Sequence, residues 1–190
     1  MKNDEEIEFL TDYYLDSVEI LKKFDNFDDI INAKSMMLQT KENSGKLMFA
    51  GNGASASIAN HASLDFTKQG NINSVNFNES AFITAFANDF GYENWLKKAV
   101  EFYGKKGDTL VLISSSGTSE NIVRAAEYAK GNDINVITFT GFSCENALAK
   151  IGDINFWVDS RAYNIIEGIH QIWLLSICDL IIGKKEYAVS

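Results

Sequence analysis

Proline is absent from the 190 residues of this chain. Its turns must therefore be formed by glycine, asparagine, aspartate and serine, and cis-proline turns are excluded. Cysteine and histidine are scarce, with two of each, and the spacing of Cys144 and Cys178 is not typical of a metal site. No signal peptide is evident and we expect no membrane span. These features together predict free thiols in a cytoplasmic protein.

Basic residues are also in short supply. The chain has 17 lysines and arginines against 26 acidic residues, which gives a net charge of −9. A surface of this sign repels phosphate backbones, so we expect no direct binding to nucleic acid. Hydrophobic residues make up 46% of the chain, a normal globular fraction. With no linker, repeat or low-complexity tract, residues 1–190 are expected to form a single domain.

Strand and helix patterns alternate along most of the chain. Apolar runs of strand length are at 46–50, 74–77, 110–113, 136–140 and 154–158, the last predicted at a sheet edge. Helical patterns are at 56–68, 80–87, 94–103, 119–130, 144–151 and 164–182. Residues 88–92 are expected to form a loop, and the last helix, which is apolar on most sides, is expected to be buried and to end at Gly183. The alternation predicts an α/β fold, a three-layer α/β/α sandwich around a parallel sheet of about five strands.

Two further helices are predicted before the first strand, at 4–24 and 27–42. Their apolar surface is wide for elements outside a sheet. It would suit either a subunit interface or packing on the helices' own domain. We therefore divide the chain into an N-terminal helical pair, residues 1–44, for oligomerisation, and an α/β core, residues 45–190.

Hydroxyl groups are concentrated in residues 114–119, SSSGTS, between an apolar strand and a helix. The N-terminus of that helix offers unpaired N–H groups and the positive end of its dipole. The hydroxyls add neutral donors, and Gly117 lets the backbone turn tightly. This combination predicts a site for an anion, most simply a phosphate monoester. The alternative is a serine-rich helix cap without a ligand.

A second loop of small residues, 51–55, also joins a strand to a helix. The carboxyl ends of parallel strands meet at one edge of a sheet, so the two loops are expected to lie near each other. On the following helix, His61 and Asp65 share a face at spacing i, i+4. They could bind a metal or move protons, or form a plain surface pair.

Glu167 and His170 are polar residues near the start of the apolar last helix. Burial of an unpartnered carboxylate is costly, so Glu167 should face water or a polar site. The alternative is that both residues meet solvent at the end of the helix.

Three segments, at 51–70, 87–93 and 107–141, together resemble the sedoheptulose-7-phosphate (phosphoheptose) isomerases of the sugar isomerase (SIS) superfamily. The likeness extends over nearly the whole chain. It implies a flavodoxin-like SIS domain with a five-stranded parallel sheet. It also implies a homo-oligomer, most simply a tetramer of dihedral symmetry, that acts on a phosphorylated sugar.

The resemblance assigns roles to individual residues. Phosphate binding is implied for Ser114, Ser116, Gly117, Thr118 and Ser119. Contacts to the sugar are implied for Asn52, Gly53, Ser55 and Asp89. His61 matches a zinc ligand of the family, Asp65 stands where the family has a glutamate that is both base and ligand, and Glu167 where it has a glutamine ligand. The family's second histidine, two turns further on, is replaced by Leu175.

These matches predict an aldose–ketose isomerase that converts sedoheptulose 7-phosphate to D-glycero-D-manno-heptose 7-phosphate. Asp65 or Glu167 would be the base, with His61 or His170 assisting. Leu175 supports an alternative, a non-catalytic SIS protein that binds a phosphosugar or a partner. We expect no tightly bound cofactor. His61, Asp65 and Glu167 would at most hold a divalent metal weakly, with a preference for Mn²⁺ or Mg²⁺ over the family's zinc.

Overall fold

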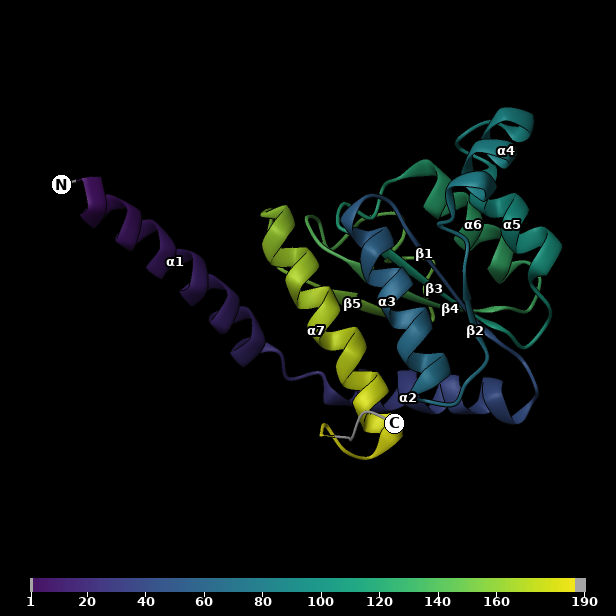
Figure 1. Cartoon of the computed structure of the whole chain (residues 1–190), viewed down its shortest axis with the longest axis horizontal. Coiled ribbons are helices and arrows are strands. Elements are labelled where there is room, and N and C mark those ends of the chain that lie inside the picture. The colour runs from purple at the N-terminus through teal and green to yellow at the C-terminus, as the bar shows by residue number, and fades with distance from the viewer. Residues whose placement is uncertain (1, 187–190) are drawn as a thin grey trace.

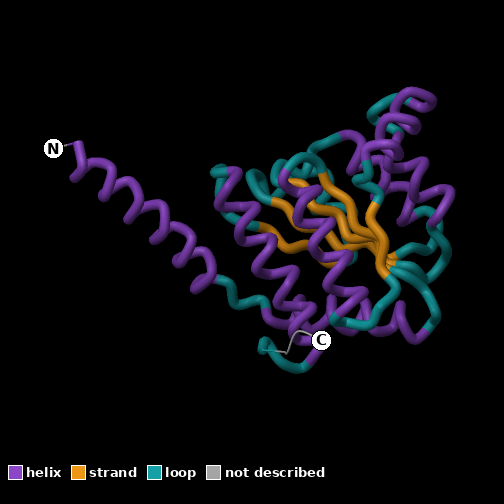
Figure 2. The backbone as a smooth tube through the Cα atoms, in the orientation of Figure 1, coloured by secondary structure: helices purple, strands orange, loops and turns teal. Residues whose placement is uncertain are grey.

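Five parallel strands lie in the order β2-β1-β3-β4-β5 in a computed structural model that describes residues 2–186 (Figure 2). They are β1 (Leu47–Gly51), β2 (Ser74–Asn76), β3 (Thr109–Ser114), β4 (Asn135–Thr140) and β5 (Ile154–Trp157). The central strands β1 and β3 are buried along their whole length, as expected for a parallel sheet covered on both faces. The five predicted strands are confirmed, including the position of β5 at an edge.

Seven helices accompany the sheet in the described part of the chain (Figure 1). They are α1 (Lys2–Lys23), α2 (Phe27–Glu42), α3 (Ala54–Lys68), α4 (Ser80–Phe90), α5 (Trp95–Tyr103), α6 (Glu120–Lys130) and α7 (Tyr163–Ile182). Alternate strand residues supply two cores. Phe49 and Val111 pack with α2, α3 and α7, whereas Met48 and Leu110 pack with α5 and α6. The predicted three-layer α/β/α sandwich is therefore confirmed.

The two N-terminal helices behave differently. Helix α2 packs on its own domain, where Ile30, Ala33 and Met37 are buried. Helix α1 extends away from the rest of the chain (Figure 1). It leaves large apolar side chains exposed, namely Ile7, Phe9, Leu10, Tyr14, Leu15 and Val18. Much of the exposed apolar surface of residues 2–186 therefore lies on α1.

The structure corrects two local predictions. Residues 88–90 are the last turn of α4 and not a loop, because the contacting rings of Phe82, Phe86 and Phe90 continue the apolar side of that helix up to Gly91. The predicted helix at 144–151 does not form, and these residues make turns instead. There the side chain of Asn146 binds the backbone of Ser143 and Ala149, which competes with helical hydrogen bonds.

Helix α7 is the one helix among residues 2–186 that is long and apolar enough to cross a membrane by length and composition. In the structure it packs on the sheet and on α3, and Ile166, Ile169 and Leu174 are buried there. The buried side of this apolar helix thus belongs to the core. Gly183 caps the helix in the left-handed conformation at φ 81°, which confirms the predicted end.

Candidate functional site

The loops 51–55 and 114–119 lie at the point where the order of the strands in the sheet reverses. Strands β1 and β3 are neighbours, and Gly51 pairs with Ile113 at their carboxyl ends. The chain then continues into α3 on one face and α6 on the other. Parallel α/β proteins bind their ligands at such a position. The pairing of β1 with β3 therefore brings the loops 51–55 and 114–119 close together, as predicted.

The serine loop is folded on itself. The N–H of Gly117 donates to the carbonyl of Ser114 over 3.0 Å. The hydroxyl of Thr118 lies 3.1 Å from Ser116 Oγ, which also accepts from the backbone of Thr118. Ser119 is the N-cap of α6 but makes no capping hydrogen bond through its side chain. Its hydroxyl is therefore not used by the helix, which argues against a loop that serves only as a cap.

A turn from the following loop supports this segment. Gly117 has φ +64°, and a Cβ added to it would lie 2.0 Å from Oδ1 of Asn146. The N–H of Leu148 donates to the carbonyl of Gly117 over 3.0 Å. Asn146 is buried and was missed by sequence reasoning, because its position depends on a turn that the pattern predicted as helix.

Asn52, a predicted sugar contact, bridges the two loops. Its side-chain amide exchanges two hydrogen bonds with Asn121 in the first turn of α6, at 3.0 and 2.9 Å. The hydroxyl of Tyr92 also donates to Asn52 Oδ1, at 3.3 Å. One amide hydrogen of Asn52 remains for a ligand. Nothing in the sequence pattern indicated Asn121, which is buried.

The other predicted sugar contacts, Gly53, Ser55 and Asp89, lie on two different helices or their ends. Gly53 precedes α3 with φ +56°, a conformation that favours glycine. Ser55 is buried in the first turn of α3. Asp89 is exposed in the last turn of α4, where its carboxylate accepts from Asn88 over 2.9 Å. The structure does not bring Asp89 into contact with the other predicted residues.

His61 and Asp65 are in contact on α3, and a residue from another helix joins this pair. His61 Nε2 lies 3.1 Å from Asp65 Oδ2, with 46% of the His61 side chain and 22% of the Asp65 side chain exposed. His61 Nδ1 lies 3.3 Å from Nε2 of Gln171 on α7. Helices α3 and α7 lie side by side on the same face of the sheet (Figure 1). Gln171 was missed because it is 110 residues away along the chain.

Glu167 and His170 occupy different environments although they are three residues apart. Burial raises the pKa of Glu167, and the nearby hydroxyl of Ser115 opposes this shift. That hydroxyl has no partner in hydrogen-bonding geometry. Glu167 therefore lies beside the serine loop, one turn before Gln171. The expectation that Glu167 faces a polar site agrees with this position.

His170 points into the core instead. It is fully buried, and its Nε2 lies 2.9 Å from the carbonyl oxygen of Thr140 at the end of β4. Its Nδ1 has no hydrogen-bond partner. Burial lowers the pKa of His170 to about 4, so the ring is neutral at pH 7. The structure therefore does not bring His170 together with His61, Asp65 or Glu167, nor does it expose His170 at the helix end.

Comparisons with known proteins agree with this geometry. The SIS domain family matches residues 12–141. The phosphoheptose isomerase of Colwellia psychrerythraea is 33% identical over 160 residues, which covers 80% of this chain and 82% of the relative. This chain belongs to the phosphoheptose isomerase family of SIS-domain proteins. The phosphoheptose isomerase of Helicobacter pylori is 32% identical over 77% of this chain and 79% of that relative.

Solved structures of the family share the fold. A phosphoheptose isomerase from Neisseria gonorrhoeae has a TM-score of 0.84 at 29% identity, covering 92% of this chain and 98% of that one. The one from Francisella tularensis has a TM-score of 0.85 at 29% identity, covering 97% of this chain and 100% of that one. The predicted SIS fold and family are therefore confirmed.

The metal site that the resemblance implies does not fit the donor groups of this chain. Both ring nitrogens of His61 are already in contact with a side chain, Nε2 with Asp65 and Nδ1 with Gln171. A metal ion bound to either nitrogen would therefore displace the side chain that contacts it. Leu175 offers no ligand atom. Within residues 2–186 no three His, Cys, Asp or Glu side chains form a group that could hold a metal ion. We therefore derive the chemistry from the side chains alone.

The cysteines do not contribute a reactive group to this site. Cys178 is buried in α7, and burial, with smaller contributions from Asp65 and Asp179, raises the pKa of its thiol to about 12. Such a thiol is a poor nucleophile. Cys144 is exposed and also free. Both are free thiols, as the sequence predicts.

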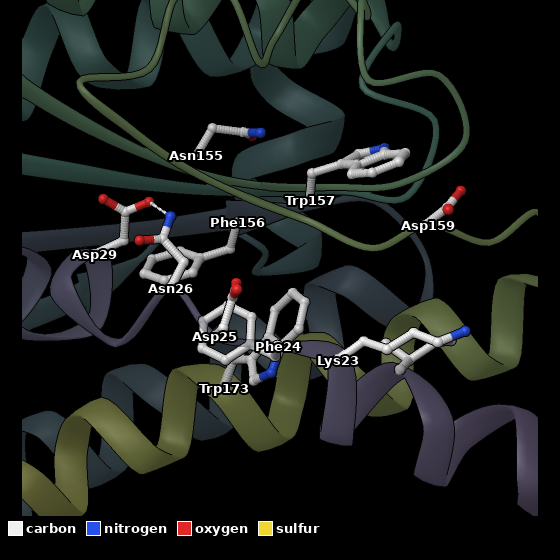
Figure 3. A pocket seen from close by; sticks show the side chains of 11 residues that line it. Lys23, Phe24, Asp25, Asn26, Asp29, Asn155, Phe156, Trp157, Asp159 and Trp173 are labelled. Carbon is white, nitrogen blue, oxygen red and sulfur yellow. Dashed lines mark hydrogen bonds between the residues drawn. The ribbon is translucent and has the colours of Figure 1, made fainter.

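A separate hollow of about 420 Å³ lies at the base of α1. Figure 3 shows Phe24 close to Trp173, with Asn26 bonded to Asp29 beside them. The rest of the wall comes from Ile20, Lys23, Asp25, Asn155, Phe156, Trp157 and Asp159. None of the predicted site residues lines it, so we do not assign the substrate to this hollow.

His170 makes the stability of this protein dependent on pH. In the unfolded chain a histidine takes up a proton near pH 6.5, whereas the folded His170 resists protonation until about pH 4. The unfolded state thus binds more protons, and the His170 contribution to stability is lost as the pH falls from 6.5 towards 4. We expect a loss of about 3 kcal/mol over this range. Urea denaturation at pH 7 and pH 4.5 measures it.

The variant His170→Gln isolates the contribution of His170 to the pH dependence of stability, because glutamine keeps a donor for the carbonyl of Thr140 and does not titrate. The pH dependence of the unfolding free energy should be flatter in the variant. Parallel curves for the two proteins would contradict the prediction.

Proposed function

We propose that this chain interconverts sedoheptulose 7-phosphate and D-glycero-D-manno-heptose 7-phosphate as an aldose–ketose isomerase. The observation that carries the proposal is that α7 carries polar side chains beside both the serine loop and the His61–Asp65 pair. Glu167 lies near Ser115 of the serine loop, and Gln171, one turn further along α7, contacts His61 of the pair. These groups would supply the phosphate anchor and the proton-transfer group that this isomerisation requires.

The proposed mechanism needs no group from outside the chain. Ser116, Thr118 and the N-terminus of α6 hold the phosphate of the sugar. Asp65 removes the proton from the carbon next to the carbonyl group. Glu167, whose pKa is raised by burial, gives a proton to the carbonyl oxygen when it is in its protonated form, so that an enediol forms. The enediol then gains a proton on the former carbonyl carbon and loses the hydroxyl proton of the adjacent carbon, which becomes the new carbonyl carbon of the aldose.

Incubation with sedoheptulose 7-phosphate, with and without added Zn²⁺, tests the function. We expect conversion to the aldose, followed by NMR, in protein freed of metal by chelation. Binding of the sugar without turnover under either condition would instead favour the non-catalytic alternative, which Leu175 suggests. Elemental analysis of the protein as purified tests our expectation that it holds no tightly bound zinc. A ratio near one zinc per chain would contradict that expectation.

Two hydroxyls of the serine loop are expected to contribute directly to affinity. Ser116→Ala and Thr118→Ala each remove a donor to a charged acceptor and should weaken binding of the phosphosugar by about 1–3 kcal/mol. Titration calorimetry measures the loss. Ser35→Ala on α2 is the control, because this exposed hydroxyl only bonds its own helix at Ile31. Unchanged affinity in both loop variants would remove the phosphate site from this loop.

We infer that the chain assembles as a cytoplasmic homotetramer through α1. The large apolar side chains that this helix exposes on the single subunit support the inference, because such a patch is typical of an interaction surface. Light scattering at micromolar concentration should give a multiple of 21.2 kDa, the mass of one chain, four being the expected number. Phe9→Asp, at a residue with 68% of its surface exposed, should reduce that number. A monomeric wild-type protein would refute assembly.

A further inference from the structure

We propose that Gln171 is a positioning residue that fixes the tautomer of His61 and thereby aims the Asp65 carboxylate. The expected effect on catalysis rests on the proposed function. The expected effect on the His61 tautomer rests only on the contacts between α3 and α7. Gln171 lies in the part of α7 that faces the His61–Asp65 pair. It was assigned no role by the sequence motifs.

The proton on His61 follows from the partners of its two nitrogens. An ionised carboxylate can only accept hydrogen bonds. His61 Nε2, which lies 3.1 Å from Asp65 Oδ2, must therefore carry the hydrogen. In the neutral ring Nδ1 is then an acceptor, and the amide N–H of Gln171 donates to it over 3.3 Å. The three side chains thus form a directed series, from Gln171 to His61 to Asp65.

The spacing on α7 places Gln171 at the centre of this arrangement. Glu167, Gln171 and Leu175 follow one another at intervals of four residues and so share one stripe of the helix. Gln171 lies one turn after Glu167, the residue beside the serine loop. It lies one turn before Leu175, which stands where the resemblance implies a second histidine. Gln171 therefore holds the imidazole from α7 at a place where this chain has lost a ligand.

The physical effect is preorganisation. His61 is nearly half exposed, and a single contact to Asp65 would leave its ring free to rotate. A second hydrogen bond from another helix fixes the ring plane, and the N–H of the ring then fixes one oxygen of Asp65. The other oxygen stays available as the base. A misplacement of about 1 Å at such a group can cost on the order of 100-fold in rate.

Nitrogen NMR of protein labelled at histidine tests the structural part without any turnover. The chain has only two histidines, and His170→Gln identifies the signals of His61. At alkaline pH we expect wild-type His61 to be almost wholly the tautomer with hydrogen on Nε2. Gln171→Met, which keeps the size of the side chain but removes the donor, should shift His61 towards a mixture of the two tautomers.

Kinetics with sedoheptulose 7-phosphate test the catalytic part. Gln171→Met should lower kcat by about 10- to 100-fold and leave KM within about twofold. The control is Gln39→Met, an exposed glutamine on α2 far from the site, which should change neither quantity. Unchanged His61 tautomers in Gln171→Met would overturn the inference whether or not the protein turns over. A tautomer shift without any activity in the wild-type protein would instead count against the proposed function alone.

Discussion

Gly117→Ala is expected to abolish measurable binding of the phosphosugar and to destabilise the fold. An alanine at φ +64° is strained, and its Cβ would lie 2.0 Å from Oδ1 and 2.2 Å from Cγ of Asn146. Asn146 cannot easily yield, because both ends of its amide bind the backbone of its own turn. The serine loop must therefore move, and its donors would no longer converge on one phosphate. The expected loss of stability is about 3 kcal/mol or more.

Calorimetry with the phosphosugar and thermal unfolding of the variant measure the two effects. Gly107→Ala is the matched control, since Gly107 has φ +86° but no atom within 4 Å of an added Cβ. It should cost only the strain of the backbone, about 1 kcal/mol, and leave binding intact. Equal behaviour of the two variants would mean that the turn at Asn146 does not hold the serine loop.

Asp65→Asn is expected to have the largest effect on turnover. The amide has nearly the same shape as the carboxylate and can still accept a hydrogen bond from His61, but it cannot take a proton from carbon. We expect kcat to fall on the order of 1,000-fold, with little change in KM, because the phosphate anchor is untouched. Initial rates with sedoheptulose 7-phosphate measure this loss.

Asp133→Asn provides the control, since Asp133 is an exposed carboxylate whose partner is Lys106 on the surface. Its activity should match that of the wild-type protein. If Asp65→Asn kept a comparable rate, the base would have to be sought elsewhere in the site, with Glu167 as the first candidate.

The sheet was predictable because each strand is a short apolar run followed by a helix. Loop 114–119 was likewise visible, as its hydroxyls are neighbours in the chain. The two incorrect predictions, the loop at 88–92 and the helix at 144–151, have a common cause. In both segments the hydrophobic pattern was weak, and side-chain interactions determined the local structure. Asn146 stabilised turns in place of a helix, and the phenylalanine row of α4 extended that helix through Asp89.

The candidate site was less predictable, because its contacts join segments that are far apart. Asn52 meets Asn121, and His61 meets Gln171, across 69 and 110 residues. Spacing identifies pairs on one helix, such as His61 and Asp65, but carries no information about a second helix. The same limit applies to His170, whose position next to Glu167 in the sequence gave no sign that its ring points into the core.

The arrangement of α7 has a consequence for how the protein is made on the ribosome. This helix covers the face of the sheet that carries α3, yet it is translated after all five strands. Until it emerges, the part of this core that α7 covers, which includes Phe139, lacks its helix. The contact between His61 and Gln171 can therefore form only after α7 has been synthesised.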